Sequence, residues 1–131
     1  MMSALTRLGL VPRTHLLTTT GRKTGQLRSN PVTIVRYNNR RWLVAPYGVV
    51  PWVLNARAAG EVSLSRRRSR RRFAVREVSP SEAGPVLRRY VEIAGVTQKY
   101  FAAKTGDPAA EFAAEAAAHP VFELIPLIMR D

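Results

Sequence analysis

The chain has 131 residues, 46% of them apolar, and its 21 basic and 9 acidic residues give a formal net charge of +12. It contains no cysteine, which excludes disulfides, thiolate catalysis and cysteine-ligated zinc or iron–sulfur sites. No run of about 18 apolar residues is present, and two histidines are too few for a histidine-rich metal site. We therefore expect one domain over residues 1–131, a cytoplasmic location and an anionic partner.

The first half of the chain has the pattern of strands. The segment Thr14–Thr20 is rich in β-branched residues. Asn30–Tyr37 predicts a second strand with Pro31 near its start, where a missing hydrogen-bond donor is tolerated. Asparagine accepts left-handed backbone angles, so Asn38-Asn39 predicts a tight turn into a third strand over Arg41–Ala45. The second and third strands are thus expected to form a hairpin.

A short helix and a second hairpin are expected next. Pro51 suits the first position of a helix, and Gly60 suits the residue beyond its end. The segments Glu61–Ser65 and Arg71–Val78 then show the alternation of two half-buried strands.

The last part of the chain is expected to be helical until a final strand. Ser79 and Glu82 have the spacing of a capping box, and apolar residues recur at helical spacing after them. Asp107 predicts the start of another helix that ends before His119, and Val121–Ile125 predicts a strand. Strands first, helices later and one strand last indicate an α+β fold with a mainly antiparallel sheet, closed as a barrel.

A positively charged loop lies between the first two strands. It is bounded by Gly21 and Gly25, and glycines allow tight turns whose N–H groups can converge on an anion. The same pattern also fits an ordinary basic hairpin turn, so the residues alone leave both interpretations open. The side chains that add charge or a hydroxyl donor are Arg22, Lys23, Thr24 and Arg28.

The segment Val44–Asn55 is a second candidate for binding an anion. It combines a strand end, a turn and a helix start, and the first turn of a helix exposes unpaired N–H groups that favour negative charge. In the alternative interpretation, Trp52 belongs to the core and Asn55 is a hydrogen-bonding brace.

Six arginines occupy the seven positions from 66 to 72. Such a run fits a patch for nucleic acid or anionic lipid. It also fits a solvated hairpin tip, which we favour because only Phe73 offers an aromatic ring nearby.

Recognisable catalytic groups are missing from the sequence. His15 has no carboxylate near it in sequence, and the acidic residues show no paired spacing. Hydrolase motifs are absent as well. Catalysis is therefore expected to depend on a bound cofactor, with the protein supplying position and electrostatics.

Three segments together resemble the deazaflavin-dependent nitroreductase family of actinobacteria: Leu16–Pro31, Tyr47-Gly48 and Trp52–Asn55. The run Thr18–Gln26 is nearly identical to the family's motif. The resemblance implies a split β-barrel with flanking helices that binds coenzyme F420. It also implies hydride transfer from the reduced coenzyme to a quinone, a nitroaromatic or another activated acceptor.

The resemblance also implies which residues form the cofactor site. Those expected at the phosphate and the acidic tail are Arg22, Lys23, Thr24 and Arg28. Those expected beside the ring are Ser29, Asn30, Pro31, Val32, Val44, Ala45, Pro46 and Tyr47. Those expected at the phosphate-side helix start are Pro51, Trp52, Val53, Leu54 and Asn55. Tyr100 corresponds loosely to the family's substrate-side tyrosines and is the one candidate on the catalytic side.

Several alternatives stay open at this stage. FMN is the less favoured cofactor, and the positive charge and apolar C-terminal segment also suit a non-enzymatic protein that carries a cofactor or contacts an anionic membrane surface. A nucleic-acid-binding barrel is the third hypothesis, although no specific nucleic-acid partner is expected. A homodimer is suggested only by analogy with other split barrels.

Overall fold

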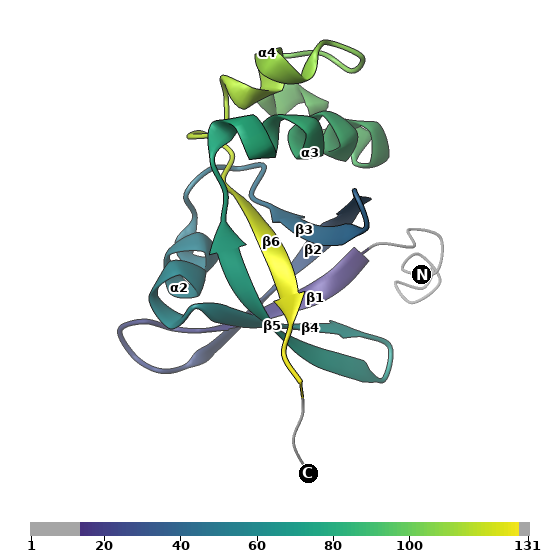
Figure 1. Cartoon of the computed structure of the whole chain (residues 1–131). Helices are drawn as coiled ribbons and strands as arrows, with labels where there is room; N and C mark the ends of the chain where they lie inside the picture. The colour runs from purple at the N-terminus through teal and green to yellow at the C-terminus, as the bar shows by residue number, and fades with distance from the viewer. Residues whose placement is uncertain (1–13, 129–131) are drawn as a thin grey trace.

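The computed structural model describes residues 14–128, which form a closed barrel of six antiparallel strands with helices at one end and one side (Figure 1). Around the barrel the strands follow the order β1-β2-β3-β6-β5-β4, and β4 pairs with β1. The strands are β1 (Thr14–Thr20), β2 (Leu27–Tyr37), β3 (Arg40–Val44), β4 (Glu61–Arg66), β5 (Ser69–Glu77) and β6 (Val121–Pro126). The predicted α+β fold with a mainly antiparallel sheet is confirmed.

The β1–β2 hairpin is longer than the sequence predicts. Strand β2 begins at Leu27 instead of Asn30, because its first residues pair with β1 from Thr20 onward. Pro31 therefore lies inside the strand and not near its start. Its missing N–H is tolerated because β3 pairs with β2 only from Ile34, which leaves that edge of β2 without a neighbouring strand among the described residues.

The two other predicted hairpins are confirmed. Asn38 and Asn39 both adopt left-handed angles, with φ of 56° and 64°, in the turn between β2 and β3. In the β4–β5 hairpin, Val62 and Leu64 face the core, being 2% and 4% exposed. This hairpin is tighter than predicted, since β5 begins at Ser69 within the arginine run.

Helix α2 (Pro51–Ala59) lies against the side of the barrel beside the β1–β2 turn, and helix α3 (Pro80–Ile93) covers its upper end (Figure 1). Gly60 ends α2 at a φ of 75°, as predicted. Only the serine half of the predicted capping box forms: the Ser79 hydroxyl accepts from the Glu82 amide at 3.5 Å, whereas the Glu82 carboxylate binds Arg76. A 3₁₀ helix, η1 (Gly95–Tyr100), follows α3.

Helix α4 (Ala109–Ala113) is shorter than the predicted helix, which was expected to reach almost to His119. Turns closed by bonds such as that from the Glu115 amide to the Phe112 carbonyl, at 2.9 Å, replace its second half. In this segment the Glu115 carboxylate accepts the amides of Ala102 and Ala103 at 2.9 and 2.7 Å. Packing against α3 holds α4 in place, and a Cβ added at Gly84 would lie 2.6 Å from the Ala109 carbonyl oxygen.

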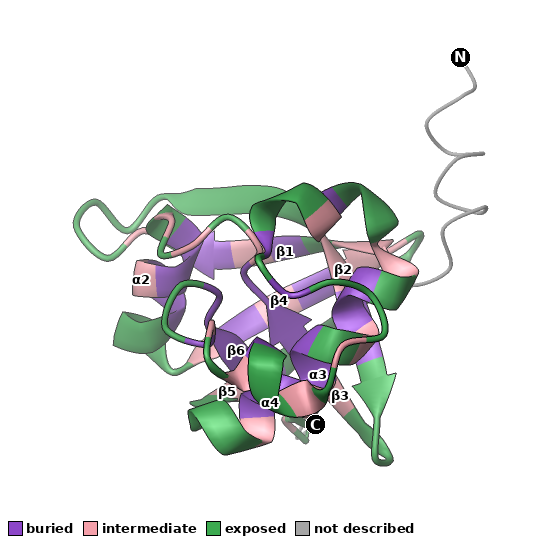
Figure 2. Ribbon diagram, turned by 90° about the horizontal axis from the view of Figure 1, so that it is seen from above, coloured by how far each residue is buried: buried purple, intermediate pink, exposed green. Residues whose placement is uncertain are grey.

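Buried side chains form two layers, one inside the barrel and one between the barrel and α3. In Figure 2 the buried positions, in purple, lie on strands of the barrel and on α3. The barrel layer includes Leu17, Leu43 and Phe122. The upper layer joins the outer face of β2 and β3, represented by Val35 and Trp42, to the apolar face of α3. These two layers hold α2 and α3 against the barrel, and the two cavities of the candidate site lie between β2 and these helices.

Candidate functional site

Two adjoining cavities follow strand β2 and share Trp52 in their walls. The larger has a volume of about 620 Å³ and lies between the β1–β2 turn, β2 and the start of α2. The smaller, of about 160 Å³, lies between β2, the turn after β3, the end of α3 and η1. Trp52 is 7% exposed and packs on Phe122 at 6.0 Å between ring centroids, so it is both a core residue and a cavity wall.

The structure brings together most of the predicted site residues. The larger cavity is lined by Arg22, Lys23, Thr24, Arg28, Ser29, Asn30, Pro51, Trp52 and Asn55. The smaller is lined by Pro31, Val32, Val44, Pro46 and Tyr47. Ala45 and Val53 are 1% and 0% exposed in the core, and Leu54 lines neither cavity. Tyr100 lines neither, but its ring meets Tyr47 edge-on at 4.9 Å.

The β1–β2 turn uses most of its amides for its own closure. The Gly21 amide donates to the Gln26 carbonyl at 2.7 Å, and the Gly25 amide donates to the Gly21 carbonyl at 2.8 Å. The Gln26 amide donates to the Thr24 hydroxyl at 3.2 Å. Most N–H groups of this turn are therefore engaged within the protein and cannot converge on an anion. Among the described contacts, only the amides of Lys23 and Thr24 have no acceptor.

Side-chain charge is the main electrostatic feature of the larger cavity. Arg22, Lys23 and Arg28 line it, and none of them forms an ion pair with a carboxylate of residues 14–128. By contrast, Arg72 and Arg76 outside the cavity both pair with glutamates. Three cations without a neighbouring carboxylate create a field that favours an anionic ligand.

Asn55 ties helix α2 to this charged turn. It is 2% exposed, and its Oδ1 accepts from the Arg22 amide at 3.1 Å and from the Arg22 guanidinium at 2.9 Å. Its Nδ2 donates to the Thr19 hydroxyl at 3.2 Å. The interpretation of Asn55 as a hydrogen-bonding brace is confirmed, and the brace fixes Arg22 in the wall of the larger cavity.

The start of α2 adds a second source of positive potential. Pro51 occupies the first turn, and Val50 provides no side-chain cap. Both residues line the larger cavity together with Trp52. An uncapped helix start of this kind carries partial positive charge and favours an anion in front of it.

The smaller cavity is aromatic and carries hydroxyl groups. Tyr90, on α3, and Thr97, on η1, are both 4% exposed and line it. Burial raises the pKa of Tyr90 to about 12, helped by Tyr47 and opposed by a hydrogen bond with Thr97. Tyr90 therefore stays protonated near neutral pH. Because the Thr97 hydroxyl donates to the Ala94 carbonyl at 2.7 Å, the Tyr90 hydroxyl donates its hydrogen to Thr97.

His119 holds the turn that bears Tyr47. It is 5% exposed, stacks on Phe101 at 4.0 Å between centroids, and its Nδ1 lies 2.8 Å from the Pro46 carbonyl oxygen. Because a carbonyl oxygen only accepts, Nδ1 carries the hydrogen. This packing fixes one wall of the smaller cavity from the segment that precedes β6.

Several cavity residues are absent from the sequence prediction. Tyr90 lies on the apolar face of a predicted helix, a position that predicts a core residue. Nothing in its spacing indicates a site residue. A hydroxyl-bearing ring on an otherwise aliphatic face is the one signal that points to it. The other additional residues are Thr14, Gly21, Leu27, Thr33, Val50, Ala94, Val96 and Thr97.

No helix within residues 14–128 has the length and apolar character needed to cross a bilayer. In that part of the chain, no three histidine or acidic side chains gather as a metal site would need.

The sequence of the chain matches a known protein family. Residues 3–110 match the model of the F420H(2)-dependent quinone reductase family. No curated protein matches the chain in sequence.

Solved structures share the fold. A structure of an F420-H2-dependent reductase (FDR-A) is 24% identical, with a TM-score of 0.57 over 86% of this chain and 93% of that one. A structure described as a domain-swapped dimer is also 24% identical, with a TM-score of 0.57 over 86% and 79%. A putative pyridoxamine 5'-phosphate oxidase from Listeria innocua is 10% identical, with a TM-score of 0.58 over 95% and 94%. The predicted split β-barrel is therefore confirmed.

Proposed function

The chain belongs to the F420H(2)-dependent quinone reductase family, and from this membership we propose that it reduces a quinone, a nitroaromatic or another activated small molecule. The family consists of enzymes that use coenzyme F420, which has a deazaflavin ring, a phosphate-bearing linker and a poly-glutamate tail. When bound, the reduced coenzyme supplies the hydride. The class of acceptor is our proposal, and the residues of the two cavities support it.

One observation carries the proposal: a cationic cavity and an aromatic cavity adjoin along β2 and share Trp52. A ligand with an anionic tail and a flat ring needs this pair of surfaces in this order. Lys23 and Arg28 would hold the phosphate and carboxylate groups, together with the part of the Arg22 guanidinium that Asn55 leaves unused. The smaller cavity would take the ring.

The aromatic cavity suits the orientation of a ring and the approach of an acceptor. The Tyr90 hydroxyl, whose hydrogen is used on Thr97, would offer its oxygen as an acceptor beside the ring, and its high pKa makes it a poor proton source. Tyr47 and Tyr100 are 63% and 46% exposed at the rim, so their edge-on pair would meet an acceptor that comes from solvent. The Lys99 ammonium lies 5.5 Å from the centroid of the Tyr100 ring, and its positive charge would favour an anionic acceptor.

Fluorescence titration with purified F420 tests the assignment, with FMN titrated in parallel. We expect K23A/R28A to weaken F420 binding by about tenfold or more for each charge removed, since each loses a charge-assisted contact. The matched control, R88A/K104A, removes the same charge from exposed positions outside both cavities and should stay within about twofold. Unchanged affinity in K23A/R28A, or tighter binding of FMN than of F420, would contradict the proposal.

A further inference from the structure

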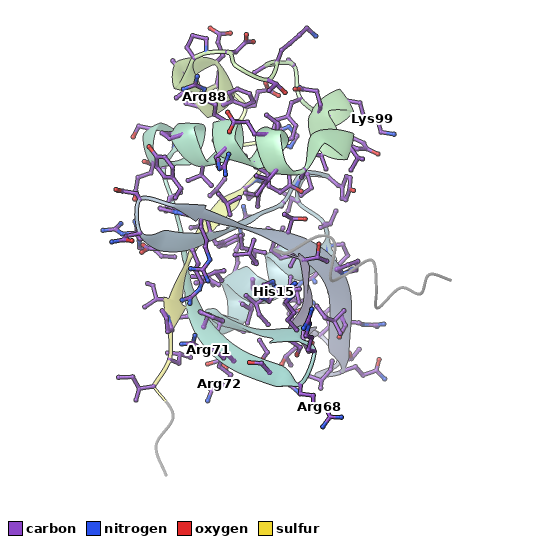
Figure 3. All side chains as sticks on the ribbon, turned by 90° about the vertical axis from the view of Figure 1, so that its right-hand side faces the viewer. His15, Arg68, Arg71, Arg72, Arg88 and Lys99 are labelled. Carbon is purple, nitrogen blue, oxygen red and sulfur yellow. The ribbon has the colours of Figure 1, made fainter. Side chains whose placement is uncertain are left out.

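A third cavity lies inside one mouth of the barrel and shares no lining residue with the two cavities already described. We call it the barrel-mouth cavity; its volume is about 440 Å³. Arg71, which lines it, lies at the end of the molecule opposite Arg88 and helix α3 (Figure 3). Its polar lining residues are His15, Arg36, Arg41, Arg66, Ser69 and Arg71.

Strand alternation explains how four arginines reach one cavity. Side chains two apart on a strand face the same side of the sheet. On β2 and β3, Ile34 and Leu43 belong to the barrel core, and the positions two residues nearer the hairpin turn are Arg36 and Arg41. The β4–β5 hairpin repeats this arrangement: Leu64 and Phe73 are core, and the next inward positions are Arg66 and Arg71. The arginines thus continue the inward face of the barrel beyond its apolar core.

The arginine run is therefore not uniformly a solvated hairpin tip. Arg67, Arg68 and Arg70 are exposed, as predicted for a tip. Arg72 faces outward and pairs with Glu61 at 2.9 Å. Arg71, between them, belongs to the barrel-mouth cavity instead, because closure of the barrel turns alternate positions inward.

The inward arginines differ from the outward ones in their partners. Arg40, Arg72 and Arg76 face outward, and each pairs with a glutamate. No carboxylate of residues 14–128 forms an ion pair with Arg36, Arg41 or Arg71. The glutamates that pair with these outward arginines thus lie on the outside of the barrel, and none of them pairs with Arg36, Arg41 or Arg71.

Like charges crowd one another in this cavity. Arg36 and Arg41 lie directly opposite in the β2–β3 ladder, a placement that is unfavourable for two cations. Burial lowers the pKa of Arg41, and the charges of Arg36 and Arg71 lower it further. The guanidinium groups of Arg41 and Arg71 lie 5.8 and 5.3 Å from the centre of the Phe73 ring, which holds both near the cavity floor.

We propose that the barrel-mouth cavity binds a compact polyanion, a small molecule or head group that carries two or more phosphate groups. Guanidinium groups bind phosphate oxygens in pairs of hydrogen bonds, and several of them converge here on one volume. A volume of about 440 Å³ suits a small ligand and not a duplex. Phe73, the cavity's aromatic ring, is 3% exposed, so it offers no face for stacking a nucleic-acid base. An anion would remove the repulsion that the sequence builds into this mouth.

Calorimetric titration with sodium tripolyphosphate, at about 0.15 M salt and without coenzyme, tests the proposal. Binding should weaken by about tenfold in R71Q and by about a hundredfold in R41Q/R71Q. R70Q/R88Q is the matched control, since Arg70 is the exposed neighbour on β5, and it should bind as the wild type does. R71Q changes an exposed strand end and keeps the test valid if R41Q/R71Q does not fold.

A second arm identifies the source of the phosphates. Co-sedimentation with cardiolipin vesicles, whose head group carries two phosphates, is compared with phosphatidylcholine vesicles. Tripolyphosphate binding that R41Q/R71Q loses assigns a soluble ligand, and cardiolipin binding alone with the same loss assigns a lipid head group. Absence of both, or an equal loss in R70Q/R88Q, overturns the proposal. F420 affinity should be unchanged in R41Q/R71Q, so this test is independent of the coenzyme site.

Discussion

Replacing Asn55 by alanine removes the side chain that joins helix α2 to the charged β1–β2 turn. Asn55 makes three hydrogen bonds, two with Arg22 and one with Thr19, and is 2% exposed. Each bond contributes about 1 kcal/mol net, and the vacated space adds to the loss, so N55A should destabilise the fold by about 3–4 kcal/mol. Thermal unfolding should then shift down by about 10–15 °C for a domain of this size.

A second substitution separates support of the turn from charge. Asn55→Asp keeps the shape and the acceptor for Arg22, and the Thr19 hydroxyl can donate to the carboxylate in place of the lost donor. N55D should therefore retain most of the wild-type stability. It should nevertheless bind F420 about tenfold more weakly, because the new negative charge lies beside the cations that we propose bind the phosphate.

Melting followed by circular dichroism, together with F420 titration of the same samples, measures both effects. N55A is expected to lose stability and affinity, and N55D affinity alone. If N55A melted within about 2 °C of the wild type, Asn55 would not be a structural brace. If N55D bound F420 as tightly as the wild type, the larger cavity would not hold the anionic part of the coenzyme.

Two further predictions concern stability away from the site. G84A should lower the free energy of unfolding by about 1–3 kcal/mol, since its Cβ would meet the Ala109 carbonyl oxygen at 2.6 Å. G95A is the control and should leave the free energy of unfolding unchanged, since a Cβ there has no atom within 4 Å. Equal melting temperatures of the two variants would contradict this prediction. The hydrogen-bonded Arg76 guanidinium holds the pKa of Glu82 below its ordinary value of 4.5. The stability that this ion pair contributes is therefore complete above about pH 4.5 and is lost as the pH falls through the lower pKa of the folded state. R76Q should therefore show a shallower loss of stability on acidification, and an unchanged acid profile would refute the assignment.

Short-range chemistry in the sequence determines the turns, the caps and the charged loop. Asn38 and Asn39 form their turn, and Gly60 and Ser79 cap their helices, because each acts on backbone groups within a few residues. The cationic turn near Lys23 was recognisable for the same reason, since its residues are consecutive.

Tertiary structure decided what depends on residues far apart in the chain. His119 forms a hydrogen bond with the Pro46 carbonyl from 73 positions away. Tyr90 lines the smaller cavity only because α3 covers the outer face of β2. Helix α4 gives way to turns in the segment where the Glu115 carboxylate accepts amides of residues 102 and 103, a contact that local spacing does not reveal. In the same way, the sequence of the arginine run predicts a solvated hairpin tip. Closure of the barrel nevertheless places Arg71 in the same cavity as Arg41. Local spacing fixes the direction of each side chain along its own strand, and only closure of the barrel fixes what that side chain faces.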